Sequence, residues 1–451
     1  MNQAYKAAVS YIDQIPGFAK KTGLSNTQYI LQKLGDPHSK IPCIHVAGTN
    51  GKGSVSKMLS LMLRSEGRKT GLFTSPHLIR INERIEVDGQ AISDEDFASC
   101  FQIVKKTVDE ILENKETYEG QECYHPAYFE FLFLMAAVYF EKCGCEAVVY
   151  ETGLGGRLDA TNTVLPKVCV ITRIGMDHMQ YLGSTIESIA AEKAGIIKEK
   201  VPVVIQSGKK EADEVLIRQA KKLAAAYFLE GFDPVGFVRE DLPPYQYDNA
   251  ATAIRAYLVW KSVMSGSKEP IVEVPGEDDA NRIRKALQDF FIPARFELLS
   301  ENCVIDGGHN EDAILRFCEA VLSYKKKKGF QKLILVYGAA ADKDYETVIR
   351  ILVSQLSPDR VFVTQIPGGR ALSATTAAMQ FQTQIKNSQS ISFFQDKIIG
   401  SDEKPIGKIH IYEDYKEAWL TAKKCQDSDT LLAACGSLYL AGGILKMERS
   451  S

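Results

Sequence analysis

The feature that most constrains the fold is an apolar run that ends in a glycine-rich loop and passes directly into a helical pattern. Residues 41–48, "IPCIHVAG", are almost entirely apolar, as expected of a strand buried on both faces of a parallel sheet. The loop "TNGKGS" (49–54) follows, and a helical pattern starts at Ser54. Such a loop brings backbone N–H groups and a helix N-terminus together where a phosphate can bind. We therefore expect a parallel α/β sheet with a phosphate-binding loop.

The alternation of apolar runs and helical patterns continues along the chain, and at 451 residues two domains are expected. We predict a P-loop-containing, mostly parallel sheet in an N-terminal domain (1–296) and a smaller Rossmann-like α/β domain (297–451), with the active site in the cleft between them. The segment 387–407 is expected to be an irregular surface insertion. The predicted strands are 41–48, 68–75, 145–152, 167–174, 201–206, 332–338, 360–365, 408–412 and 430–436.

Charge and composition exclude several classes of function. Lys and Arg number 54 against 57 Asp and Glu, so no global positive field would gather nucleic acid. We find neither a secretory signal nor an apolar run of membrane-spanning length, and therefore expect a cytoplasmic protein with no membrane partner. The ten cysteines form no C-x-x-C pair and are predicted to be reduced core residues.

The loop departs from the usual phosphate-binding consensus G-x-x-x-x-G-K-[ST]. Val46 occupies the first glycine position, and Gly53 separates Lys52 from the hydroxyl of Ser54. A glycine-rich turn without function is the alternative interpretation. The preceding strand, the following helix and the Lys-Gly-Ser order favour a nucleotide site. Its predicted ATP-binding residues are Thr49, Asn50, Gly51, Lys52, Gly53 and Ser54.

Two further strands end in groups that suit a magnesium ion. Ser75 ends the predicted strand 68–75, and Glu151 lies at the end of 145–152, before the glycine-rich turn that contains Asp159. Hydroxyl and carboxylate oxygens are the ligands that Mg²⁺ prefers. A satisfied serine in a turn and a capping carboxylate are the structural alternatives.

His178 and Lys193 indicate a functional site only in combination with these motifs. A lone histidine after a strand is usually structural, and a lysine on an apolar helical face usually extends its ammonium to solvent. In the second domain, polar groups again follow strands, namely Asp306, His309, Asn310, Asp342, Lys343 and Asp344. Carboxyl ends of neighbouring strands form the ligand-binding edge of an open sheet.

In chain order, the motifs resemble those of folylpolyglutamate synthase, including the bifunctional bacterial dihydrofolate synthase form, within the Mur ligase superfamily. The motifs are "GTNGKGS", "TSPHL", "INERI", "ETGLGGRLDATN", "DHMQYLG", "EKAGIIK", "DNAATA", "ARFE", "DGGHN" and "DKD". The resemblance runs from about residue 25 to the terminal "CGSLYLAGGIL".

The resemblance implies an ATP-dependent ligase that joins L-glutamate to a folate or to dihydropteroate through an acyl phosphate. It implies two Mg²⁺ ions, allows K⁺, and suggests a monomer. By position, the metal ligands would be Ser75, Glu151 and His178. Lys52, His178 and Lys193 would be catalytic, with Lys193 carbamylated.

The resemblance also assigns binding residues. Asn249 would contact adenine, Arg295 and His309 the phosphates, and Asp306 the nucleotide near the ribose. The pterin or folate site would comprise Ala127, Tyr128, Phe129, Glu130, Leu158, Asp159 and Ala160. Ala127 replaces the family's threonine, and Tyr245 replaces a usual histidine before the adenine motif.

Two alternatives remain open at this point. A Mur-type ligase for another carboxylate would share the nucleotide loop but need a different acceptor pocket. A nucleotide-binding module that has lost catalysis would retain the fold without the reaction. The intact set Lys52, Glu151, His178 and Lys193 favours an active ligase.

Overall fold

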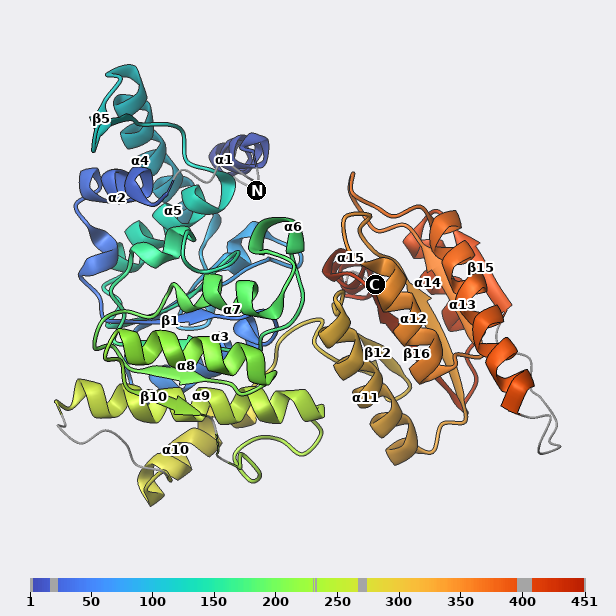
Figure 1. The fold of residues 1–451 in the computed structure, drawn as a ribbon. Helices are drawn as coiled ribbons and strands as arrows, with labels where there is room; N and C mark the ends of the chain where they lie inside the picture. The colour runs from blue at the N-terminus through green and yellow to red at the C-terminus, as the bar shows by residue number, and fades with distance from the viewer. Residues whose placement is uncertain are drawn as a thin grey trace. The chain divides into compact units, whose positions relative to one another are not determined.

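The structure, a computed structural model, describes residues 3–16, 23–229, 231, 233–266, 274–395 and 408–449. The chain divides into two compact units, Met1–Phe290 and Phe291–Ser451 (Figure 1). Each unit contains its own sheet with helices packed around it, which confirms the predicted α/β class.

The sheet of the first unit is mostly parallel and has the strand order β10-β9-β8-β1-β7-β2-β3-β4. The first six strands in this order, from β10 through β2, run parallel to one another. Strands β3 and β4 then add an antiparallel edge. The strands are β1 Cys43–Ala47, β2 Thr70–Phe73, β3 Ile85–Val87, β4 Gln90–Ala91, β7 Ala147–Glu151, β8 Val168–Ile171, β9 Val203–Ile205 and β10 Tyr227–Leu229. A separate hairpin pairs β5 Thr117–Tyr118 with β6 Gln121–Glu122.

The helices of this unit bury the apolar strands. The rings of Phe73 and Tyr150 contact α5 (Tyr128–Lys142) through Phe129 and Phe133, and α3 (Lys52–Ser65) packs against α9 (Pro244–Met264). The remaining helices are α1 Gln3–Gln14, α2 Ser25–Lys33, α4 Asp94–Glu113, α6 Met179–Leu182, α7 Ile186–Ala194, α8 Lys210–Lys222 and α10 Glu277–Gln288. Short 3₁₀ turns lie at η1 Pro37–Ser39, η2 Ile81–Arg84 and η3 Ala160–Thr163.

The second unit has the strand order β11-β12-β16-β13-β14-β15, antiparallel only between β11 and β12. Its strands are β11 Glu297–Ser300, β12 Cys303–Ile305, β13 Lys332–Tyr337, β14 Arg360–Thr364, β15 Lys408–Tyr412 and β16 Thr430–Cys435. Its helices are α11 Glu311–Lys328, α12 Tyr345–Leu356, α13 Ala374–Gln395, α14 Tyr415–Lys424 and α15 Leu438–Glu448.

The expectation of an irregular segment at 387–407 is wrong for its first part. Helix α13 continues to Gln395, because the run 374–395 has no proline or glycine to end it. Residues 396–407 lie outside the described residues.

All ten cysteines are unpaired, and eight are buried, as the sequence predicts. Within the described ranges, no helix combines the length and the apolar character needed to cross a membrane.

Candidate active site

The phosphate loop joins β1 to α3 through two glycines with positive φ. Gly48 has φ 152° and Gly51 has φ 87°. A Cβ at Gly48 would lie 1.8 Å from the Oγ1 of Thr172, and one at Gly51 would lie 2.4 Å from the Oδ1 of Asn249. Both positions therefore require glycine for the loop to approach its neighbours.

Neighbouring backbone holds the first half of the loop. The amides of Thr49 and Asn50 both donate to the carbonyl of Arg173, at 2.9 and 3.2 Å. These two N–H groups are thus engaged within the protein. The amides of Lys52 and Gly53 lie in the first turn of α3, where no earlier helical carbonyl can accept from them. The helix start is therefore the part of the loop best suited to an anion.

Two lysines converge on one carbonyl oxygen of this loop. The Nζ of Lys52 donates to the oxygens of Gly48 at 3.2 Å and Thr49 at 3.3 Å. The Nζ of Lys193, from α7, donates to the same Gly48 oxygen at 2.7 Å. The structure thus brings together two residues that are 141 positions apart in the sequence (193 − 52).

The Lys193 side chain is buried, with 4% of the residue exposed. Burial, and then the nearby ammonium of Lys52, lower the pKa of Lys193 to about 7. Near neutral pH this amine is therefore only partly protonated. A neutral amine is a nucleophile, which an ordinary surface lysine is not at this pH.

Glu151 ends β7 next to the strand that leads to the phosphate loop, since it pairs with Val46 of β1. It is 2% exposed, and its Oε2 accepts a hydrogen bond from the amide of Ser75 at 3.0 Å. Two predicted metal ligands, Ser75 and Glu151, therefore lie together at one edge of the sheet.

His178 directly precedes α6 and has a left-handed backbone, at φ 51°, and its side chain is 37% exposed. Its Nε2 lies 3.7 Å from the Oδ2 of Asp177. Asp177 was not predicted as a site residue, although it stands directly before His178. Gly175, in the same loop, exchanges two hydrogen bonds of 3.1 Å with the hydroxyl of Thr49, which ties this loop to the phosphate loop.

The donor set suits Mg²⁺ rather than a metal held by protein alone. Within the described part of the chain, His, Cys, Asp and Glu side chains form no group of three that could hold a metal. Mg²⁺ is usually bound by one or two carboxylates together with phosphate oxygens and water. A buried carboxylate at Glu151 beside a phosphate loop fits that arrangement.

Asn249 of α9 belongs to a buried chain of hydrogen bonds that reaches the phosphate-loop helix. Its Nδ2 donates to the Oε1 of Gln246 at 3.0 Å, and the Nε2 of Gln246 donates to the Oγ of Ser54 at 3.2 Å. Gln246 was not predicted as a site residue. The chain places two predicted nucleotide residues, Asn249 and Ser54, in one network.

The predicted pterin segment forms the start of α5. Ala127 precedes the helix, and its amide donates to the Oε2 of Glu130 at 2.8 Å. Burial raises the pKa of the Glu130 carboxyl. The ring of Phe129 lies against Gly153, where a Cβ would come within 2.8 Å of it. The guanidinium of Arg84 lies over the ring of Tyr128, with 5.4 Å between the Arg84 Cζ and the ring centroid.

Asp159 is buried and organises the loop after β7. Its Oδ2 accepts from the amides of Gly153 at 2.9 Å and Leu154 at 3.0 Å. Its Oδ1 accepts from the amide of Thr161 at 3.1 Å and from the Thr161 hydroxyl. Burial raises the pKa of Asp159, while these four bonds favour the ionised form. A carboxylate has about four acceptor positions, so the loop itself occupies them.

The two neighbours of Asp159 differ in exposure. Leu158 is 40% exposed, whereas Ala160 is buried. Of this predicted trio, Leu158 is therefore the side chain that a ligand could reach most easily.

In the second unit, Asp306 follows β12 and is buried. Its Oδ2 accepts from the amide of Phe296 at 2.8 Å and its Oδ1 from that of Gly308 at 2.6 Å. The Nδ1 of His309 lies 3.0 Å from the carbonyl oxygen of Gly307. Arg295 directly precedes Phe296, so Asp306 connects the segments that carry both predicted phosphate contacts.

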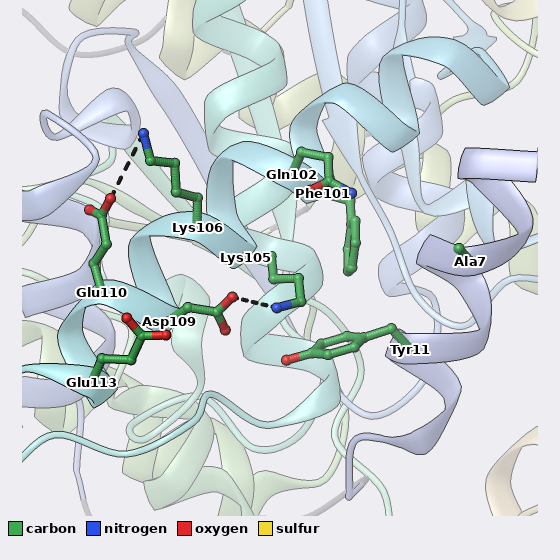
Figure 2. A pocket seen from close by; sticks show the side chains of 9 residues that line it. All are labelled: Ala7, Tyr11, Phe101, Gln102, Lys105, Lys106, Asp109, Glu110 and Glu113. Atoms are coloured by element: carbon green, nitrogen blue, oxygen red, sulfur yellow. Dashed lines mark hydrogen bonds and ion pairs between the residues drawn. The ribbon is translucent and has the colours of Figure 1, made fainter.

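A groove of about 490 Å³ lies between α1 and α4, apart from these residues (Figure 2). None of the predicted site residues lines it. Four of its five charged side chains pair with one another, Lys105 with Asp109 and Lys106 with Glu110.

Two family models match the chain. The Dihydrofolate synthetase C-terminal domain matches residues 297–447, and the Mur ligase middle domain matches residues 125–232. The second match contains Glu151, Asp159, His178 and Lys193, four of the predicted site residues.

Solved structures share this fold over nearly the whole chain. A Mycobacterium tuberculosis folylpolyglutamate synthase with ADP and AMPPCP has a TM-score of 0.80 and 25% identity, covering 99% of this chain and 98% of that one. A folylpolyglutamate synthase complex with AMPPCP and folate has a TM-score of 0.76 and 27% identity, covering 99% of both chains.

The sequence comparison is closer still. The dihydrofolate synthase/folylpolyglutamate synthase of Bacillus subtilis is 36% identical over 372 residues, which span 78% of this chain and 83% of that protein. Identity at this level over most of both proteins means that the chain belongs to the dihydrofolate synthase/folylpolyglutamate synthase family.

Proposed function

We propose that the chain is an ATP-dependent ligase that joins L-glutamate to a folate-type carboxylate. The reaction is polyglutamylation of tetrahydrofolate, conversion of dihydropteroate to dihydrofolate, or both. The single observation that carries this proposal is the convergence of Lys52 and Lys193 on the Gly48 carbonyl, one strand away from the buried carboxylate of Glu151. Relatives named for these activities, and solved with ADP, AMPPCP or folate, support it.

The reaction has two steps in this proposal. An oxygen of the substrate carboxylate attacks the γ-phosphorus of ATP, which forms an acyl phosphate and releases ADP. The glutamate amine then attacks the acyl carbon, which forms the amide and releases phosphate and a proton. The first amides of α3 and the ammonium of Lys52 stabilise the negative charge of the transferring phosphoryl group.

Ser75, Glu151 and His178 would hold Mg²⁺, with two ions at full occupancy; K⁺ is a further candidate. Bound Mg²⁺ would neutralise charge on the phosphate oxygens. Glu151 contributes a carboxylate that is already desolvated and fixed by the Ser75 amide, so it loses little further freedom on binding.

Lys193 would act as a carbamate. Its neutral amine attacks CO₂, a nitrogen–carbon bond forms, and one proton is released to solvent. The buried position and the pKa of about 7 favour this step, because the reactive neutral amine is present near neutral pH. The modification replaces a buried cation with an anion beside Lys52, which removes the repulsion between the two ammonium groups.

The remaining contacts follow the family resemblance. Asn249 would contact adenine, Arg295 and His309 the phosphates, and Asp306 the nucleotide near the ribose. Because Asp306 already accepts two backbone amides, we expect it to act through the segment that carries Arg295 and His309 as well as directly.

Phe129 and Tyr128 would offer aromatic faces to the pterin, with Leu158 at the rim. Ala127, Glu130, Asp159 and Ala160 would complete the site. A pterin donor would have to share an oxygen of Asp159 with the loop amides. Glu130 uses Oε2 for the Ala127 amide.

We also propose that the enzyme is cytoplasmic and monomeric, and that it has no nucleic-acid or membrane partner.

Phosphate release from ATP tests the proposal. The purified protein is assayed with glutamate and either dihydropteroate or tetrahydrofolate, and we expect release with at least one of them. Release with neither, but with another carboxylate, would identify a Mur-type ligase of different specificity. No release with any acceptor, together with ATP binding, would indicate a module that has lost catalysis.

A further inference from the structure

Two tyrosines of α1 use their rings and their hydroxyls for different contacts. The ring of Tyr5 packs edge-on against Phe97 with centroids 5.4 Å apart, and the ring of Tyr11 packs edge-on against Phe101 at 5.3 Å. Both phenylalanines belong to α4, so the two rings hold α1 on that helix. The hydroxyl groups extend beyond this packing and reach two other segments.

The hydroxyl of Tyr5 donates to the Oδ1 of Asn82. Asn82 lies in the 3₁₀ turn η2, directly before Glu83. The Glu83 carboxylate accepts from the amides of Leu78 at 2.7 Å and Arg80 at 2.8 Å, which folds the loop after Ser75. Tyr5 therefore holds the residue next to the carboxylate that shapes this loop.

The hydroxyl of Tyr11 lies 2.8 Å from the Nε2 of His125. The Nδ1 of His125 lies 2.8 Å from the carbonyl oxygen of Pro126. A carbonyl can only accept, so Nδ1 carries the proton and Nε2 accepts from Tyr11. The His125 ring also stacks on Phe131, with planes 10° apart. This arrangement fixes the backbone directly before Ala127, where the predicted pterin segment begins.

The surroundings of Tyr11 leave its hydroxyl for His125. The ammonium of Lys105 lies 5.2 Å from the ring centroid of Tyr11, and it is paired with Asp109 (Figure 2). The cation therefore contacts the face of the ring and the carboxylate of its own helix. The Tyr11–His125 bond is a separate contact at the far end of the phenol.

We propose that Tyr5 and Tyr11 are positioning residues for the acceptor site, and that their hydroxyls order residues 78–84 and 125–130 before the folate-type substrate binds. The identity of the substrate rests on the proposed function, whereas the ordering of the two segments does not. The two segments also meet directly, since the Arg84 guanidinium lies over the Tyr128 ring. Loosening either hydroxyl contact should therefore loosen both segments.

The variants Tyr5→Phe and Tyr11→Phe remove one oxygen each and retain the ring packing on α4. We expect the KM for the folate-type acceptor to rise about threefold to tenfold in each variant, as the loss of one hydrogen bond predicts, with a larger rise in the double variant. The KM for ATP should stay within about twofold of wild type, because the phosphate loop keeps its contacts. A purely structural role would lower Tm without separating the two KM values.

Amide hydrogen exchange gives a readout that does not depend on activity. In the double variant, the amides of Leu78, Arg80 and Ala127 should exchange roughly threefold to tenfold faster, while those of α3 stay unchanged. Tyr29→Phe is the matched control, since it loses a hydroxyl contact of 2.6 Å to Glu116 elsewhere in the same unit. It should leave both readouts at wild-type values.

The outcomes separate this inference from the proposed function. Wild-type protein without ligase activity on any folate-type acceptor would overturn the proposed function, and the exchange rates would still decide the ordering of the two segments. Unchanged exchange in the double variant, or faster exchange with an unchanged acceptor KM in an active enzyme, would overturn the positioning role of the two tyrosines.

Discussion

The phosphate loop and the segments in and around the proposed acceptor site use charge in opposite ways. In the phosphate loop, the Nζ atoms of Lys52 and Lys193 both donate to the Gly48 carbonyl oxygen. In the acceptor segments (residues 75–84, 127–130 and 153–161), the carboxylates accept from backbone amides: Glu83 from three, Glu130 from one and Asp159 from three.

The two regions are thus prepared for their ligands in different ways. The Lys52 ammonium donates to two neutral carbonyl oxygens and gains when an anion arrives, so the phosphate loop is prepared by charge. Carboxylates that already bind backbone amides hold their loops in shape, so the acceptor site is prepared by conformation. Substitutions should therefore affect the chemical step in the first region, and stability and acceptor binding in the second.

Lys193→Ala should have the largest effect on the phosphate-loop side. We expect turnover below detection, because both the amine and its carbamate are lost, and added bicarbonate should not restore it. ¹³C NMR with labelled bicarbonate should show a carbamate carbon in wild type and none in the variant. Wild-type activity in the variant would remove Lys193 from the mechanism.

Lys52→Ala should lower kcat by a factor that corresponds to about 3 kcal/mol or more, since an ammonium that stabilises the transferring phosphoryl group is removed. Steady-state kinetics at saturating substrates measure this effect. Lys57→Ala is the control on the same helix, where Nζ contacts Glu86 instead. An unchanged kcat for Lys52→Ala would contradict the proposed role.

The buried Lys193 amine should make stability depend on pH. Its folded pKa is about 7, below the ordinary value of 10.5 expected for the unfolded chain. Between these values the unfolded state binds more protons, so stability should rise with pH, by at most about 1.4 kcal/mol per pH unit. Urea unfolding in CO₂-free buffer at pH 7 and pH 9 measures the rise, and Lys193→Met should abolish it. An equal rise in unfolding free energy between pH 7 and pH 9 in both proteins would contradict the burial of an uncharged Lys193 amine.

Asp159→Asn tests the acceptor segments, where we expect the conformation of the loop after β7 to be destabilised. The amide has one acceptor oxygen in place of two, and its NH₂ would face backbone donors, so the loop should lose about 2 kcal/mol of unfolding free energy. Asp289→Asn, at an exposed position, should stay within about 0.5 kcal/mol of wild type. Urea unfolding compares the two variants, and the same small change in both would show that the Asp159 bonds contribute little.

Much of the fold was predictable because its elements are local. The strands β1, β7, β8 and β16 lie inside the predicted apolar runs, since strands buried on both faces need uninterrupted apolar sequence. The antiparallel edge β3-β4 was not predicted, because both strands are short and partly polar. The same limit applies to α13, whose polar C-terminal part lacks the periodicity that marks a buried helix.

The strand, loop and helix of the phosphate site follow from local sequence, because the glycines and the apolar run act on adjacent residues. Which side chains meet there depends on the tertiary structure. Lys193 reaches the Gly48 carbonyl across 145 residues, and Tyr11 reaches His125 across 114. No local pattern encodes such contacts, since they depend on how separate elements pack. The low pKa of Lys193 has the same origin, because neighbours distant in the sequence remove its amine from water.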